Sequence, residues 1–149
     1  MKKFLGKDDF RSVIKNTPLV SIDLLVHNSE GEVLLGQRVN EPAKGFWFVP
    51  GGRIFKDETL DTAFSRTVKD ELGLQMKRSE AVFDKVYEHF YENNVFNDAF
   101  STHYIVLAHK ISVDTLPELN TQHSEYKWFN IQALLEDANV HNYTKDYFR

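Results

Sequence analysis

The sequence predicts an α+β domain with a mixed β-sheet. Three observations support this fold class: strand-like alternation over 19–26, a helix-period apolar stripe over 59–72, and more strand-like runs before a closing helix. Strands on both sides of a helix, followed by more strands and a helix, are typical of this class. The 149 residues suit one compact domain with a substantial core.

The N-terminal segment is predicted to be a helix over about 8–16. Its apolar residues recur at helical spacing and share one face: Phe10, Val13 and Ile14. The helix is expected to end before Pro18, because the residue before a proline avoids the α region.

A set of strands is predicted next. Residues 19–26 alternate, with apolar side chains on one face and Ser21 and Asp23 on the other. A turn then leads to a return strand at 32–38, and a short apolar strand at 46–49 is closed by a Pro-Gly-Gly turn.

The clearest helix is predicted at 59–72. Its buried stripe consists of Leu60, Ala63, Phe64, Val68 and Leu72. Gly73 is expected to end it in a left-handed conformation. The remaining elements are strands at 82–91, 102–111 and 126–129, a loop at 93–98, and a helix that Asn130 caps and that runs through Leu135.

The composition excludes several classes of protein. Without cysteine there is neither a disulfide framework nor a thiolate metal site, which fits a reducing, cytoplasmic location. No apolar run is long enough to span a membrane, and no signal peptide is expected. The formal net charge of −4 is scattered without a basic stripe, so we expect neither nucleic acid nor membrane as a partner.

The most informative stretch begins at Gly52 and reads G-x5-E-x7-R-T-V-K-D-E-L-G-L. It resembles the Nudix box, G-x5-E-x7-R-E-U-x-E-E-x-G-U, in which U is a bulky aliphatic residue. Seven of the nine defining positions match: Gly52, Glu58, Arg66, Val68, Glu71, Gly73 and Leu74. Thr67 and Asp70 depart, each standing where the box has a helix Glu. The resemblance implies one Nudix domain over 1–149, with a mixed sheet sandwiched between helices (α/β/α) and an N-terminal helical extension.

The altered box bears on metal binding. Thr67, Asp70 and Glu71 are spaced to project together from the helix, where the consensus has three carboxylates. Because Mg²⁺ takes few protein carboxylates and Asp70 is short, we expect one Mg²⁺ per subunit, with Mn²⁺ as a substitute. Asp70 could instead support a second metal or merely face solvent. In the family, Glu58 and Arg66 fix the loop against the helix.

Other stretches resemble one branch of the family, the GDP-mannose mannosyl hydrolases, whose box is degenerate. They are residues 17–23, 34–38, 45–53, 88–91, 102–104 and 122–123. The resemblance covers most of the chain. It implies a homodimer that hydrolyses GDP-mannose, and also GDP-glucose, to GDP and free hexose. The bond broken is the C–O bond at sugar C1, with inversion.

The resemblance also implies site residues. Mg²⁺ would be held by Gly51, through its carbonyl, Glu71 and Gln122. Gly51 and Gly52 are expected to permit positive φ and close backbone approach to a diphosphate. His123, in a predicted loop, would be the general base, since Thr67 has no useful basicity.

Five further side chains would contact the substrate. Arg53 and Tyr104 would contact the diphosphate and the leaving oxygen, while Asp23 and Arg38 would position sugar and diphosphate. His89 would contact substrate or pack. The aromatic residues at 46–48 and 90–91 are expected to be mostly core, with one or two lining the pocket.

Two other functions stay open. One is a conventional Nudix pyrophosphatase that cleaves a nucleotide sugar at phosphorus. The absent carboxylate at Thr67 argues against it, and Asp70 mildly favours it. The other is a non-catalytic module that binds nucleotide sugars, because degenerate boxes occur in such modules.

Overall fold

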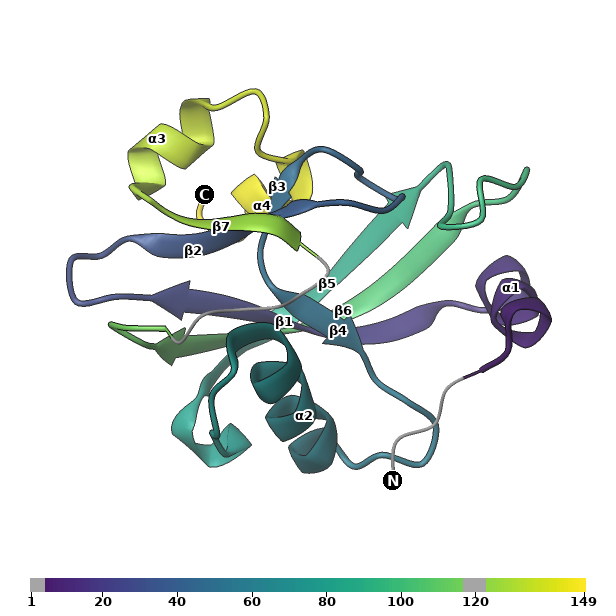
Figure 1. The fold of residues 1–149 in the computed structure, drawn as a ribbon, viewed down its shortest axis with the longest axis horizontal. Coiled ribbons are helices and arrows are strands. Elements are labelled where there is room, and N and C mark those ends of the chain that lie inside the picture. The colour runs from purple at the N-terminus through teal and green to yellow at the C-terminus, as the bar shows by residue number, and fades with distance from the viewer. Residues whose placement is uncertain (1–4, 117–122) are drawn as a thin grey trace.

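The chain forms a seven-stranded mixed sheet between helices (Figure 1). This computed structural model describes residues 5–116 and 123–149, with the side chains of 123 and 124 excepted. The sheet order is β3-β2-β1-β6-β5, with β4 paired to β1 and β7 paired to β2. β1 and β6 are parallel and the other pairs are antiparallel, so the predicted α+β class with a mixed sheet is confirmed.

The described elements follow one another in this order: α1 (Lys7–Asn16), β1 (Leu19–His27), β2 (Val33–Arg38), β3 (Trp47–Phe48), β4 (Gly51–Arg53), α2 (Leu60–Leu72), η1 (Arg78–Glu80), β5 (Val82–Tyr91), β6 (Thr102–Ser112), β7 (His123–Phe129), α3 (Ile131–Glu136) and α4 (Asn142–Asp146). Three elements were not predicted from the sequence, each of five residues or fewer: β4, η1 and α4. His123 was predicted in a loop, whereas β7 begins at this residue.

Two hydrophobic cores lie on opposite faces of the sheet. One contains Ile22, Leu24 and Val26 of β1 packed with the apolar face of α2. The other contains Leu25 with residues of β2, β3 and the C-terminal helical region, including Leu134. Figure 1 shows α2 on one side of the sheet and α3 with α4 on the other, as the predicted sandwich requires.

β1 is therefore buried on both faces, which the predicted alternation did not show. Ser21 and Asp23, which were predicted on the face opposite the apolar residues, are buried, as is Leu25. In contrast Val20, which was predicted on the apolar face, is exposed. A strand in the middle of a sheet covered by helices on both sides has no solvent face, so its polar residues need partners.

α2 ends at Gly73 as its sequence predicts, and it begins at Leu60, one residue after the predicted start, with Thr59 as its N-cap. The Thr59 hydroxyl accepts a hydrogen bond from the Thr62 amide at 3.1 Å, and Gly73 is left-handed with φ 68°. The predicted stripe is buried except for Leu60, which is 40% exposed in the first turn.

β4 packs unusually close to β1. Gly51 pairs with Asp23 and Arg53 pairs with Ser21. A Cβ atom on Gly51 would overlap Asp23 Oδ1 and lie 2.7 Å from the Ile22 carbonyl oxygen. The glycines with positive φ are Gly31, Gly45 and Gly73. The expected positive φ at Gly51 and Gly52 is therefore wrong, and Gly51 is needed for space.

We expect Gly51→Ala to lower the free energy of unfolding by about 1–3 kcal/mol, because the added methyl forces β4 away from β1. Gly52→Ala is the matched control, since its Cβ would meet Thr67 Oγ1 at 3.4 Å, near ordinary contact. Urea unfolding of both variants measures the difference. Equal losses would mean that close packing at Gly51 does not limit the β4–β1 pairing.

Candidate active site

A cavity of about 260 Å³ lies where β4 meets the sheet. Six of the residues predicted for the site line it: Asp23, Arg38, Gly51, Arg53, His89 and Tyr104. They come from five different strands, and the sheet register brings them together. Gly51 faces Asp23 across β4 and β1, while His89 faces Tyr104 across β5 and β6.

Asp23 is a buried carboxyl group on the cavity wall. The Tyr147 hydroxyl donates a short hydrogen bond to its Oδ2. Burial raises the pKa of Asp23 to about 7, and the charge of Glu71 adds to this, while Tyr147 and the charge of Arg38 oppose it. Near neutral pH the group is thus poised between its protonated and ionised forms.

His89 is buried against aromatic rings. It stacks on Tyr143 with ring centroids 4.2 Å apart and planes 10° apart, and its Nε2 lies 3.5 Å from the Tyr147 hydroxyl. Burial, with a smaller effect from His141, lowers the pKa of His89 to about 4. The ring is therefore neutral at pH 7, so His89 can act through shape and hydrogen bonding but adds no positive charge.

The positive charge of the cavity comes from two arginines. Arg38 Nε donates to the carbonyl of Pro42, another lining residue, at 2.8 Å, which restrains its guanidinium. The Arg53 guanidinium lies over the rings of Phe10 and Phe55, at 4.8 and 4.9 Å. Burial raises the pKa of Tyr104, against the charges of Arg38 and Arg53, so its phenol stays a neutral donor. Two guanidinium groups and a phenol suit an anionic ligand.

Glu71 and Asp70 have different surroundings. The buried Glu71 accepts a hydrogen bond from the Gly51 amide, with 3.2 Å between nitrogen and Oε1. The Asp70 side chain is 45% exposed and forms an ion pair with Arg66, with 3.6 Å between Asp70 Oδ2 and Arg66 Nη1. The expectation that Thr67, Asp70 and Glu71 project together is therefore wrong for Asp70. Residues 67 and 71 differ by only about 40° around a helix, whereas residue 70 lies about 60° away on the other side.

Thr67 is buried next to the loop. Its Oγ1 would lie 3.4 Å from a Cβ atom on Gly52, and it has no hydrogen-bond partner among the described residues. Where the consensus box has a carboxylate, this chain thus places a small neutral side chain in a closed position. This leaves Glu71 as the box-helix acid directed at β4.

Glu58 and Arg66 clamp the loop to α2, as the family resemblance implies. Arg66 donates to both carboxylate oxygens of Glu58, at 2.7 and 2.8 Å, and to the Arg53 carbonyl at 2.8 Å. Glu58 also accepts the Phe55 amide at 2.7 Å. The pair therefore fixes the backbone that carries Arg53.

The residues at the cavity suit Mg²⁺ only with help from other ligands. No group of three or more His, Cys, Asp or Glu within the described parts of the chain could hold a metal. Mg²⁺ commonly uses one or two carboxylates together with phosphate and water, and the buried Glu71 beside Gly51 meets that need. The predicted ligand Gln122 lies outside the described residues, as does the side chain of His123. The His123 backbone pairs with Arg38 on β2.

Several residues at the site were not found from the sequence. Tyr147, near the C-terminus, reaches Asp23 across 124 positions, and no local pattern marks it. Phe10 was predicted only as part of an apolar helix face. Of the aromatic residues at 46–48 and 90–91, Phe48 and Tyr91 line the cavity.

The fold and the box loop are those of a Nudix hydrolase. The chain belongs to the Nudix family, since the profile of the NUDIX domain matches residues 17–148. It is 42% identical over 123 residues to the low-salt glycan biosynthesis protein Agl8 of Haloferax volcanii, covering 82% of this chain and 77% of that protein.

Two further relatives show the range of the family. The ADP-ribose pyrophosphatase of Methanocaldococcus jannaschii is 34% identical over 74 residues, which cover 49% of this chain and 43% of that one. The crystal structure of a MutT protein from Methanosarcina mazei Go1 matches with a TM-score of 0.68 and 25% identity, covering 89% of this chain and 92% of that one. No helix in the described ranges is long and apolar enough to cross a membrane.

We expect the stabilising effect of Glu58 to depend on pH. Its hydrogen bonds from Arg66 hold the pKa of Glu58 below its ordinary value of 4.5. The contribution is therefore complete well above pH 4.5 and is lost as the pH falls through the lower folded-state pKa. Glu58→Gln should lower the free energy of unfolding by about 1–3 kcal/mol at pH 7.

Urea unfolding from pH 7 to pH 3 measures this. The difference in the free energy of unfolding between wild type and Glu58→Gln should become smaller at the acid end. A difference in the free energy of unfolding that stays constant to pH 3 would show that Arg66 does not favour the ionised carboxylate.

Proposed function

We propose that the protein hydrolyses GDP-mannose, and GDP-glucose, to GDP and free hexose by breaking the bond between sugar C1 and oxygen with inversion. The observation that carries this is the box helix, which directs one acid, Glu71, at Gly51 on the cavity wall. Attack on phosphorus by conventional Nudix enzymes often uses a further helix carboxylate to activate water. Here Thr67 takes that place and Asp70 pairs with Arg66.

Cleavage at carbon suits these residues. When a diphosphate leaves from C1, its charge is already stabilised, so the general acid of ordinary inverting glycosidases is not needed. Arg53 and Tyr104 would stabilise the negative charge that grows on the departing phosphate. Asp23 and Arg38 would position the sugar and the diphosphate.

Glu71, the Gly51 carbonyl and Gln122 would hold one Mg²⁺. When bound, the ion would supply positive charge to the diphosphate. The closeness of Glu71 to Gly51 supports the first two ligands, while Gln122 rests on the family resemblance alone.

His123 would remove a proton from the attacking water. The pairing of its backbone with Arg38, whose side chain lines the cavity, supports this role. A histidine base is effective near neutral pH because its ordinary pKa is close to 6.5. The resemblance to this branch also leads us to propose a homodimer.

The relatives bear on the substrate class. The name of Agl8 refers to glycan biosynthesis, a setting in which nucleotide sugars are ordinary substrates. The similarity to an ADP-ribose pyrophosphatase favours the alternative, cleavage at phosphorus. A module that binds nucleotide sugars without turnover is the second alternative.

Hydrolysis of GDP-mannose in ¹⁸O-water with Mg²⁺ tests the proposal. We expect the label in the released hexose, because water attacks carbon, and none in GDP. Mass spectrometry of both products measures it, with GDP-glucose and GDP-fucose run alongside. Label in a phosphate would establish the conventional pyrophosphatase, and no turnover would favour the binding module.

The metal assignment is tested by Glu71→Gln and its neighbouring control Asp70→Asn. Both changes remove one negative charge from the same helix turn. We expect Glu71→Gln to raise the Mg²⁺ concentration for half-maximal activity about 10-fold or more, and Asp70→Asn to change it less than about twofold, because Asp70 pairs with Arg66. Equal effects would mean that the metal is held through both acids.

His123→Gln tests the base. The variant should keep the wild-type melting temperature and lower kcat by about 10²–10⁴, the usual contribution of a positioned base. Steady-state kinetics between pH 5 and pH 9 measure this, and the loss of activity at acid pH that we expect in wild type should disappear in the variant. An unchanged kcat would remove His123 from the reaction.

A further inference from the structure

The N-terminal helix α1 forms part of the cavity wall. Its residues precede the match to the family profile, which begins at residue 17. Even so, Phe10 and Ile14 of α1 line the cavity together with Arg53 and Asp23. The site of this chain therefore includes a segment from outside the matched domain.

Phe10 makes a specific contact with Arg53. The guanidinium carbon lies 4.8 Å from the centroid of the Phe10 ring and 4.9 Å from that of Phe55. Within about 6 Å of a ring centroid, a guanidinium is attracted by the negative face of the ring. Ring contacts use the faces of the planar group, so its N–H donors remain at the edge for an anion.

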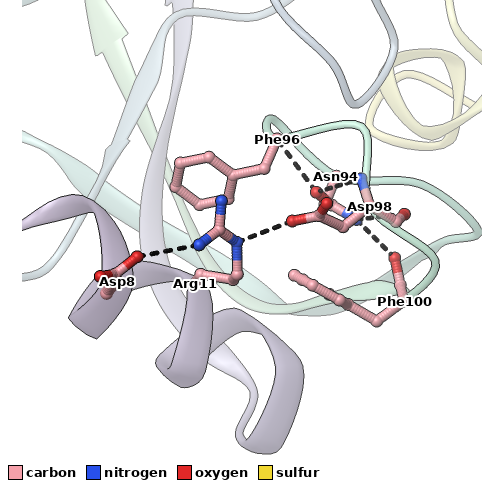
Figure 2. Close-up of polar contacts among 6 residues, drawn as sticks. All are labelled: Asp8, Arg11, Asn94, Phe96, Asp98 and Phe100. Carbon is pink, nitrogen blue, oxygen red and sulfur yellow. Dashed lines mark hydrogen bonds and ion pairs between the residues drawn. The ribbon is translucent and has the colours of Figure 1, made fainter.

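Arg11, the residue after Phe10, holds α1 against the loop between β5 and β6. Figure 2 shows Arg11 between Asp98 of that loop and Asp8 of its own helix, with donor–acceptor distances of 2.7 and 2.9 Å. The Arg11 guanidinium also lies 5.0 Å from the ring centroid of Phe96. Phe96 in turn contacts Phe10 edge to face, with centroids 5.9 Å apart.

The loop that receives α1 is itself ordered by Asn94. This side chain is fully buried. It donates to the carbonyls of Asp98 and Phe100, at 2.9 and 2.8 Å, and accepts from the amides of Phe96 and Asp98 (Figure 2). Phe96 and Asp98 are therefore held in place to receive α1, which in turn fixes Phe10.

We propose that Phe10 is a positioning residue for Arg53, and that the contacts of α1 with the β5–β6 loop make the N-terminal helix a working part of the phosphate-binding site. The proposal rests on the proposed function only in that Arg53 meets a diphosphate. It goes further because it assigns a role to a helix outside the family domain. If Phe10 merely filled the wall, its loss would affect binding whether or not Arg53 were present.

A double-mutant cycle separates these two cases. The probe is inorganic pyrophosphate with Mg²⁺, and the dissociation constant is measured by calorimetry for wild type, Phe10→Leu, Arg53→Gln and the double variant. We expect Phe10→Leu to weaken binding about 3- to 10-fold, but to have no further effect when Arg53 is already Gln. In an Arg38→Gln background the full loss should remain, because the guanidinium that lies over the Phe10 ring is that of Arg53.

Two single variants complete the test. Phe10→Tyr keeps the ring and should recover most of the affinity that Phe10→Leu loses. Phe83→Leu makes the same change at an exposed ring outside the cavity and should have no effect. The melting temperature of each variant is measured, so that an unfolded protein is not scored as weak binding.

The outcomes are distinct. Equal losses with and without Arg53, no loss in Phe10→Leu, or a wild type that does not bind pyrophosphate would overturn the proposal. Turnover of GDP-mannose is measured separately. If wild type does not hydrolyse it while the cycle behaves as expected, the proposed function fails and the role of Phe10 stands.

Discussion

The close contact between β4 and β1 controls the geometry of the site. Only three residue pairs join these strands, yet this contact sets Gly51 against Asp23 and places Arg53 one pleat further along. Glu71 of α2 then reaches the same point by accepting the Gly51 amide. Two buried carboxyl groups, from a strand and from a helix, therefore meet at one glycine, and a side chain there would separate them.

A second layer of contacts keeps this arrangement rigid. Arg66 and Glu58 form a two-bond ion pair inside the protein, and Arg66 also binds the Arg53 carbonyl. Arg66 of α2 thus binds the segment between β4 and α2 at two points, the Arg53 carbonyl where the segment begins and Glu58 further along. A buried charge is tolerated when it is paired and hydrogen-bonded in this way, so the clamp holds Arg53 without exposing the charges to water.

Both ends of the described chain pack around the site. Tyr147 and Tyr143 pack around Asp23 and His89 from the C-terminal side, while Phe10 approaches Arg53 from the N-terminal side. These aromatic groups exclude water, which explains why the pKa of Asp23 rises and that of His89 falls. The result is a cavity in which Arg38 and Arg53 supply the positive charge and the histidine is neutral.

The sequence by itself determined the box helix and the family. Helix caps, the stripe of α2 and the spacing of Glu58, Arg66 and Glu71 depend on contacts within a few residues, and these follow from local geometry. Most of the strands were found for the same reason. The predicted lining residues were identified because the family motifs keep a fixed order along the chain.

Only the tertiary structure decided which of these groups meet. Asp70 turns to Arg66, β1 is buried on both faces, β4 becomes a strand, and Tyr147 finds Asp23 across 124 positions. Such contacts depend on sheet register and on packing between distant segments, and local sequence patterns carry neither. The contact of Phe10 with Arg53 belongs to this group, because an apolar helix face shows that a side chain is covered but not what covers it.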